Sequence, residues 1–280
     1  MSFTFIDAHT HFWDPERLPY PWLVDVPAIA GAHTPDDLRQ QAGALSPSRI
    51  VFVECGAPWL DEVKWVEELA VREPRIAGIV ARCAMNAGDA TTAAIDQLRR
   101  RPLVRGVRHI IQDEADPRLC VSPEFVAGVK QLGAAGLSFD ICCRPHQLPA
   151  VIELVGACPE THFILDHAGK PDIKAGLMDP WREHLRALAA LPNVDCKLSG
   201  LINEADHTAW TIDQLRPYVM HVLETFGTSR VMFGGDWPVV RLAASYPYWL
   251  ETARQLVAHV PPVDRDALFS GNARRAYRLT

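Results

Sequence analysis

The stretch FTFIDAHTH at residues 3–11 is a short apolar run that ends in polar side chains, and the same arrangement recurs along the chain. Eight such runs, rich in β-branched residues, are predicted to be strands. They are Phe3–Ala8, Arg49–Val53, Ile76–Arg82, Val104–His109, Leu137–Cys142, His162–Asp166, Val194–Lys197 and Arg230–Phe233. After the first run, the distance from one start to the next is typical of repeated βα units.

Helical signals occupy the intervals between these runs. Apolar residues recur with helical period in Asp61–Glu73. Ser122–Pro123 and Asp179–Pro180 each offer a capping residue followed by proline at the first helical position. Strand and helix alternating eight times predict an α/β fold with a parallel sheet, and the chain length favours a closed (β/α)8 TIM barrel. No GxGxxG turn follows the first run, so the main signal for an open, doubly wound sheet is missing.

The whole chain, residues 1–280, is interpreted as a single barrel domain with two unusual segments. The segment at about residues 12–47 is too long for an ordinary βα loop, and such loops are usually functional or disordered. Its aromatic residues, among them Trp13, Tyr20 and Trp22, favour a loop that packs over the barrel mouth. A surface segment held down by its aromatics is an equal alternative. Val263–Leu279 is predicted to form a closing helix.

Composition excludes several classes of function. The formal net charge is −6 with acidic and basic residues mixed along the chain, which argues against a nucleic-acid or anionic-membrane partner. No apolar run approaches the roughly 20 residues of a membrane span, and the N-terminal stretch lacks the pattern of a signal peptide. The 7 cysteines have no paired spacing, so we expect reduced thiols and a cytoplasmic protein. The oligomeric state is left open.

Ionisable residues stand where three of the predicted strands end. The first run ends in Asp7-Ala8-His9-Thr10-His11, and alternation along a strand predicts that Asp7, His9 and His11 share a face. The sixth run is followed by His167 and the eighth by Asp236, each before a Gly/Pro-rich loop. A role for the two as turn or helix caps is the alternative for each alone. Because the first and last strands of a closed barrel are neighbours, Asp236 should lie beside the histidine pair.

The chain resembles the amidohydrolase superfamily, and within it the amidohydrolase-2 group and its sugar-acid lactonase branch, which includes L-fuconolactonase and L-rhamnonolactonase. The resemblance spans nearly the whole sequence. Its motifs are IDAHTHFW (6–13), GVRHIIQDE (106–114), ILDHAGKP (164–171), CKLSGL (196–201), MFGGDWPV (232–239) and GNARRAYRL (271–279). It implies that Asp236 is the general base and that His9, His11 and His167 complete the catalytic set.

The resemblance also bears on metal binding. Metal-dependent relatives bind zinc or a similar cation with the first-strand histidines, which here gives His9, His11, His167 and Asp236 as the candidate ligands. Dinuclear relatives carry a bridging lysine at the end of the fourth strand, where this chain has Arg108-His109. We therefore expect no cofactor requirement, or a single divalent metal, with zinc favoured.

The expected reaction is hydrolysis of a small-molecule sugar lactone, such as L-fuconolactone or L-rhamnonolactone, to the aldonic acid. Asp236 would activate water, and the imidazoles or one cation would stabilise the oxyanion. The predicted substrate-binding residues, at strand ends or among the loop aromatics, are Glu54, Arg82, His109, Arg144, Trp22 and Trp237. Two alternatives remain: a metal-dependent decarboxylase of the same superfamily, and a non-catalytic barrel, which the intact His and Asp set disfavours.

Overall fold

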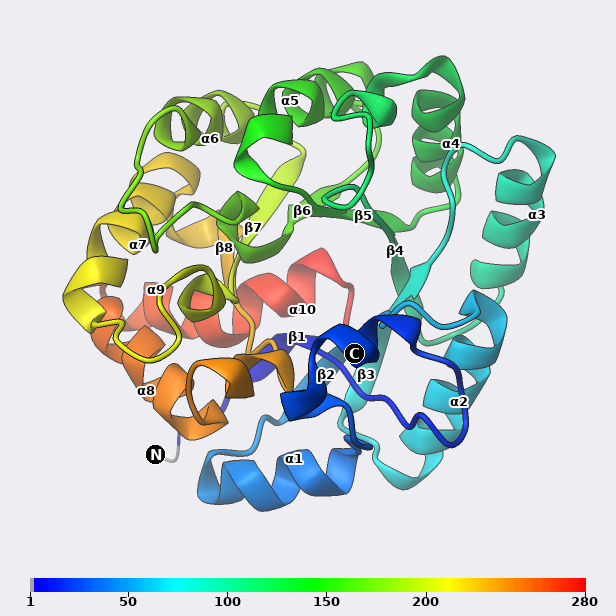
Figure 1. Cartoon of the computed structure of the whole chain (residues 1–280). Helices are drawn as coiled ribbons and strands as arrows, with labels where there is room; N and C mark the ends of the chain where they lie inside the picture. Colours follow the sequence, from blue (N-terminus) through cyan, green and yellow to red (C-terminus); the bar gives the residue numbers. More distant parts are fainter. Residues whose placement is uncertain (1–2) are drawn as a thin grey trace.

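A computed structural model describes residues 3–280 of the chain. Within them, eight parallel strands pair in sequence order, each with the next along the chain, and helices lie around them (Figure 1). The strands are β1 (Ile6–Thr10), β2 (Arg49–Val53), β3 (Ile76–Arg82), β4 (Val104–Ile110), β5 (Ser138–Cys142), β6 (Phe163–Leu165), β7 (Val194–Leu198) and β8 (Val231–Phe233). The predicted (β/α)8 barrel is confirmed, and only the strand ends differ from the predicted ranges.

The helices connect successive strands as a parallel sheet requires. They are α1 (Pro35–Ala42), α2 (Trp59–Arg72), α3 (Asp89–Leu98), α4 (Pro123–Ala134), α5 (Leu148–Ala157), α6 (Trp181–Ala189), α7 (Ile212–Phe226), α8 (Tyr246–Leu256), α9 (Pro262–Asp266) and α10 (Asn272–Ala276). Ser122 caps α4 as predicted, because its hydroxyl accepts a hydrogen bond from the Phe125 amide. Asp179 does not cap α6; its carboxylate pairs with Arg182, and the helix begins at Trp181.

Two apolar clusters pack against the strands, one between the strands and the helices and one inside the barrel. Outward-facing strand residues pack with the helices in the larger core, to which Phe52, Phe139 and Phe163 belong. A smaller cluster fills one end of the barrel interior, where strand residues such as Ile6 and Val51 contact Tyr277 and Leu279 of the C-terminal segment. In Figure 1 this segment, with α10, crosses the middle of the ring of helices. The predicted closing helix is therefore α9, a π-helical turn over Ala267–Gly271, and α10 in succession.

The predicted common face of Asp7, His9 and His11 is wrong for Asp7. A register shift between Asp7 and Thr10 interrupts the pairing of β1 with β2. Such an irregularity turns the side chains that follow it. The Asp7 carboxylate is held on the outer side of the strand, where it accepts hydrogen bonds from the Tyr246 hydroxyl of α8 and the Gly235 amide.

The long segment after β1 contains short helices and buried aromatic residues. Two 3-10 turns, Pro21–Asp25 and Pro27–Ile29, precede α1. Trp13 is fully buried, and its indole N–H donates to the carbonyls of Ile29 and Gly31. Trp13 thus holds the segment together, and Trp22 anchors it to the barrel, because its indole N–H donates to the Cys55 carbonyl just after β2.

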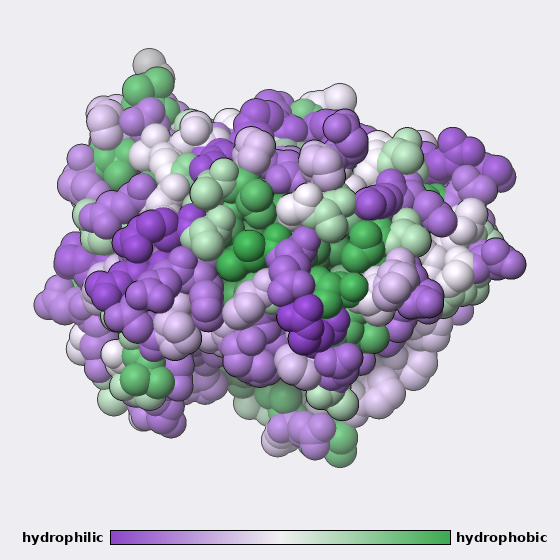
Figure 2. Space-filling view, turned by 90° about the horizontal axis from the view of Figure 1, so that it is seen from above, coloured by the Kyte–Doolittle hydropathy of each residue, from purple (hydrophilic) through white to green (hydrophobic). Residues whose placement is uncertain are grey.

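The outer surface is mostly polar. Figure 2 shows hydrophilic residues over most of one face, with hydrophobic residues between them in small groups. The large exposed apolar side chains come from separate elements, as with Val24, Val71 and Val263. None of the helices within residues 3–280 combines the length and apolarity needed to cross a lipid bilayer.

Two helical glycines provide a test of how closely the helices pack. A Cβ at Gly128 in α4 would lie 2.1 Å from the carbonyl oxygen of Met85, whereas nothing lies within 4 Å of one at Gly156 in α5. Gly128→Ala should lower the free energy of unfolding by about 1–3 kcal/mol, as overpacking does. Gly156→Ala should instead raise it by up to about 1 kcal/mol, because alanine favours the helix. Urea unfolding of both variants measures the difference, and a stabilised Gly128→Ala protein would contradict the predicted packing.

Candidate active site

Closure of the barrel brings Asp236 beside the first-strand histidines. The Asp236 amide donates to the His9 carbonyl at 2.7 Å, and the His11 amide donates to the Trp237 carbonyl at 2.7 Å. Gly234 and Gly235 permit this approach. A Cβ at Gly234 would lie 2.8 Å from that of His9, and one at Gly235 would lie 2.3 Å from the Asp7 carboxylate. The two glycines of the sequence GGD after β8 therefore allow the first and last strands to approach closely.

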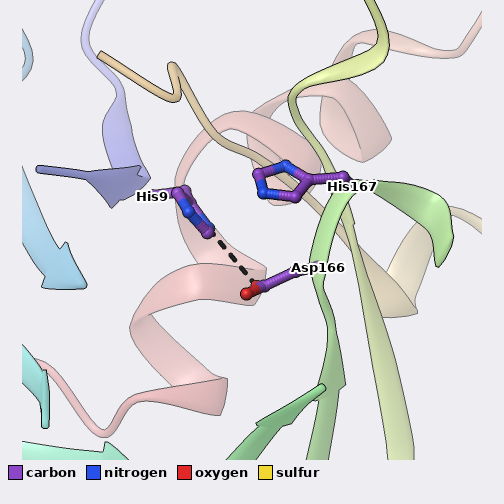
Figure 3. Close-up of side chains that lie close together, drawn as sticks. All are labelled: His9, Asp166 and His167. Carbon is purple, nitrogen blue, oxygen red and sulfur yellow. Dashed lines mark ion pairs between the residues drawn. The ribbon is translucent and has the colours of Figure 1, made fainter. Parts of the chain in front are cut away.

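The four predicted catalytic side chains converge in one place. Asp236 Oδ1 lies 3.5 Å from His11 Nε2 and 3.7 Å from His9 Nε2. The two Nε2 atoms are 3.2 Å apart, and the His9 and His167 rings lie with their centroids 4.5 Å apart. Figure 3 shows the His9 and His167 rings close together, with a dashed line that joins His9 to Asp166. Asp236 therefore lies beside His9 and His11, as expected from barrel closure.

Two of these residues stand on left-handed backbone. His167 has φ 53°, and the residues through Lys170 also have positive φ. Asp236 has φ 54°. In residues other than glycine this conformation costs about 1–2 kcal/mol each. The turn at His167 is held by Trp181, whose indole N–H donates to the Ala168 carbonyl at 2.8 Å. Strain of this kind is found where a side chain must be aimed at a site.

A cavity of about 300 Å³ opens above the histidines. Its polar lining includes three of the predicted catalytic residues, with His9 buried beneath them, and its apolar lining includes aromatic and aliphatic side chains. The lining residues are His11, Trp13, Trp22, Glu54, Cys55, Gly56, Arg108, Ile110, Gln112, Asp113, Cys142, His167, Lys170, Asp236 and Val239. Its size and mixed polarity are those of a site for a small polar molecule.

The predicted substrate-binding residues divide into two groups. Glu54 and Trp22 line the cavity. The Glu54 carboxylate already accepts from Arg108 and from the Gly56 amide, and the Trp22 indole N–H donates to the Cys55 carbonyl. Both are therefore held in place by contacts within the protein.

The other four do not line the cavity. Arg82 is exposed and donates to the Gly56 carbonyl. His109 packs against Phe125, because alternation along β4 gives the inward position to Arg108. Arg144 pairs with Glu204 beside a neighbouring hollow, and Trp237 is fully buried with its indole N–H donating to Gln41.

A layer of buried charges lies beneath the histidines, and the sequence analysis missed it. Lys197 Nζ lies 2.7 Å from Asp140 Oδ2 and 2.9 Å from Asp166 Oδ1. Arg108 pairs with Glu54 at 2.8 Å and with Asp166 at 3.1 Å. Arg108, Asp140 and Lys197 lie within β4, β5 and β7, and Asp166 directly follows β6. The signal available in the sequence was that each of four consecutive apolar runs contains ionisable residues.

Two polar residues that follow β7 contact the predicted catalytic residues, and both were also missed. The Asn203 amide donates to Asp236 Oδ2 at 2.9 Å. Ser199 lies 2.9 Å from His167 Nδ1. Ser199 directly follows β7 and belongs to the CKLSGL motif, so its position carried a signal that was overlooked. Asn203 carries no local signal, because the loop after β7 brings it to the site.

Burial governs the protonation of the site. It lowers the pKa of His9 well below the ordinary value and lowers that of His167 to about 4. Burial by itself would raise the pKa of Asp236, but the facing histidines His167, His11 and His9 bring it below the ordinary range. At neutral pH His9 and His167 are therefore neutral imidazoles beside the Asp236 carboxylate.

The donor set fits a single divalent metal. One atom each of His9, His11 and Asp236 lie within 4.8 Å of one another, and His9, Asp166 and His167 form a second such group. Asp166 is already paired with Arg108 and Lys197, so the first group is the better match. Two imidazole nitrogens and a carboxylate oxygen are ligands that zinc prefers. Because His11 Nδ1 lies 2.8 Å from the Val53 carbonyl, it carries the proton and leaves Nε2 free toward the cavity.

Comparison with known proteins places the chain among enzymes. The profile of the amidohydrolase family matches residues 6–279. L-fucono-1,5-lactonases of Burkholderia ambifaria and Burkholderia multivorans are 34% and 36% identical, each over 98% of this chain and 95% and 96% of their own. The crystal structure of an amidohydrolase from Burkholderia multivorans with bound zinc superposes with a TM-score of 0.90, at 34% identity over 99% of this chain and all of that one.

The buried state of His167 predicts how stability depends on pH. Its pKa is about 4 in the folded protein and about 6.5 in an unfolded chain. Between these values the unfolded chain binds the extra proton, so the free energy of unfolding falls as the pH falls. This one group should account for about 3 kcal/mol between pH 7 and pH 4.

Urea unfolding of the wild type and of His167→Gln across this range measures the effect. The variant should show the shallower decline with falling pH, whatever its stability at neutral pH. Equal slopes in the two proteins would show that His167 is not a buried neutral imidazole.

Proposed function

The chain belongs to the amidohydrolase family, and we propose that it is a lactonase that opens a sugar-acid lactone to the aldonic acid, with Asp236 as the base. The observation that carries the proposal is the Asp236 carboxylate beside the imidazoles of His9, His11 and His167 at the floor of a small cavity. Two relatives that match this chain over nearly its full length are L-fucono-1,5-lactonases, so L-fucono-1,5-lactone is the first substrate to test.

Asp236 is suited to activate water. Its Oδ2 accepts a hydrogen bond from Asn203, while Oδ1 faces the cavity histidines. A water at Oδ1 gives its proton to the carboxylate as its oxygen attacks the lactone carbonyl. The protonated Asp236 then donates to the ring oxygen as the C–O bond breaks. General acid–base catalysis of this kind contributes about 10²–10⁴ in rate.

The rings of His9 and His167 stabilise the oxyanion that forms on the carbonyl oxygen. Each is buried and neutral and can donate its one ring N–H, and such donors are strong in a buried site. His11 does not donate there, because its proton is on Nδ1 and bonds to the Val53 carbonyl. An ester carbonyl is more electrophilic than an amide carbonyl, and donors alone suffice for it. Where a divalent cation is bound, His9, His11 and Asp236 would hold it, and it would supply Lewis-acid polarisation of the carbonyl.

The substrate hydroxyls would contact the upper part of the cavity. Lys170 and Gln112 line it and hydrogen-bond to one another. Lys170 Nζ also lies 3.9 Å from Glu204. This polar edge faces an apolar one that includes Ile110 and Val239. A polyhydroxylated ring has polar edges and an apolar face, which matches such a lining.

Proton release from a panel of aldonolactones, measured with and without a chelator, tests the proposal. We expect hydrolysis well above the spontaneous rate for at least one six-carbon lactone. Failure on the whole panel would contradict the lactonase. Loss of CO2 from an aromatic acid that chelation abolishes would support the decarboxylase alternative instead.

Asp236→Asn should lower kcat at least about 100-fold, because the amide cannot take the proton from water. The Asn203 hydrogen bond can persist in the variant, so the fold should be unaffected. Asp213→Asn makes the same chemical change at an exposed position in α7 and should leave kcat unchanged. Steady-state kinetics of the two variants test this prediction. Near-normal turnover by Asp236→Asn would contradict the role of Asp236 as the base.

Lys170→Met should raise KM several-fold with a smaller effect on kcat, because it removes a donor from the cavity edge but not from the reacting centre. Lys174→Met is the matched control, since Lys174 lies on the surface and pairs with Asp206. An unchanged KM for Lys170→Met would exclude Lys170 from substrate binding.

A further inference from the structure

We propose that Lys197 sets the tautomer of His9, keeping its ring proton on Nε2, so that His9 faces the cavity as a hydrogen-bond donor rather than as a metal ligand. Lys197 acts here as a positioning residue, because it does not line the cavity. The proposal concerns the same site as the proposed lactonase and rests on that function only for its catalytic consequence.

The first step of the argument is the surroundings of the Lys197 ammonium group. Lys197 is fully buried in β7. Its Nζ lies 2.7 Å from Asp140 Oδ2, 2.9 Å from Asp166 Oδ1 and 3.2 Å from His9 Nδ1. An ammonium group has three N–H donors and no lone pair. Its contacts with Asp140 Oδ2 and His9 Nδ1 are hydrogen bonds, and Asp166 Oδ1 is an ion-pair partner. Because an ammonium group can only donate, its bond to His9 Nδ1 requires that nitrogen to carry no proton.

The second step comes independently from His11. Its Nδ1 lies 2.8 Å from the Val53 carbonyl, which can only accept a hydrogen bond, so the proton of His11 is on Nδ1. His11 Nε2 therefore has a free lone pair, and it lies 3.2 Å from His9 Nε2. A hydrogen bond between the two Nε2 atoms needs one proton, and His9 is the ring that can supply it. The contact with Lys197 and the contact with His11 thus indicate the same tautomer of His9, with the proton on Nε2.

The opposite tautomer is opposed by Lys197 and favoured by Asp166. Asp166 Oδ1 lies 3.3 Å from His9 Nδ1. The dashed line in Figure 3 marks this ion pair. A proton on Nδ1 could bond to that carboxylate, and Nε2 would then be free to bind a metal. In that state one Lys197 N–H would point at an N–H and lose its acceptor. Arg108 bonds to the other oxygen of Asp166, Oδ2, and the charge on Oδ1 is already compensated by the ion pair with Lys197.

Two consequences follow for the site. Without metal, the His9 N–H is directed at His11 Nε2, with Asp236 Oδ1 3.7 Å away, and it can turn to a carbonyl oxygen placed between them. A cation held through His9 Nε2 must first displace this proton to Nδ1. Lys197 therefore weakens divalent-metal binding at this site and preserves an oxyanion donor.

Nitrogen NMR of metal-free protein labelled with ¹⁵N-histidine tests the assignment, because protonated and bare ring nitrogens have well-separated shifts. His9 is assigned by loss of its signals in His9→Gln. We expect a protonated Nε2 and a bare Nδ1 in the wild type. A bare Nε2 in the wild type would overturn the proposal without any variant being needed.

The double variant Asp140→Asn, Lys197→Met removes the lysine together with the charge of the carboxylate that it leaves behind. Its His9 proton should move to Nδ1, toward Asp166. Titration with zinc chloride, followed by calorimetry, should show at least tenfold tighter binding, or about 1.4 kcal/mol. Asp140→Asn alone retains Lys197 and should keep the wild-type tautomer and the weaker zinc affinity.

An unchanged tautomer and unchanged zinc affinity in the double variant would overturn the role of Lys197. Neither measurement depends on substrate turnover. A wild type that carries the proton on Nε2 but hydrolyses no lactone would remove the proposed function and leave this assignment in place.

Discussion

The pairing of Lys197 and Arg108 with Asp140, Asp166 and Glu54 is the constraint on which the barrel interior depends. Removing one member of a buried ion pair is strongly destabilising, because the partner charge is left uncompensated in a medium of low polarity. These charges come from strands β2 and β4 to β7, so their pairing links five strands across the interior. One end of the barrel is filled by apolar side chains and Tyr277, whose hydroxyl donates to Asp140. The charged layer separates that apolar end from the cavity and supports the imidazoles above it.

The site itself contains features that are unfavourable when taken alone. His167 and Asp236 occupy left-handed backbone, and His9 and His167 are buried as neutral rings. Their positions are determined by surrounding contacts: Trp181 holds the turn at His167, and backbone hydrogen bonds with the first strand hold Asp236. The rest of the fold supplies the stability that this arrangement requires, as is common at sites that must be rigid before substrate arrives.

The sequence predicts correctly those features that depend on the periodic pattern of apolar residues alone. The apolar runs predicted the strands and their order, and barrel closure placed Asp236 beside His9 and His11. The prediction was wrong for Asp7, because a register shift within β1 cannot be seen in an alternating pattern. His109 was chosen over Arg108, although only one of two adjacent residues can point inward. Asn203 could not be predicted, because loop conformation rather than spacing brings it to the site, whereas Ser199 directly follows β7 and was overlooked.

The hydrogen bonds that join the ends of the first and last strands are made by residues of the site itself. A nascent chain emerging from the ribosome therefore has its histidine pair from the beginning and lacks the carboxylate until nearly all of it has been synthesised. The last contact to form is also among the most distant in sequence, which makes it late and slow in folding. An incompletely folded or truncated molecule would consequently be inert, and its activity would report directly that the ring of strands is complete.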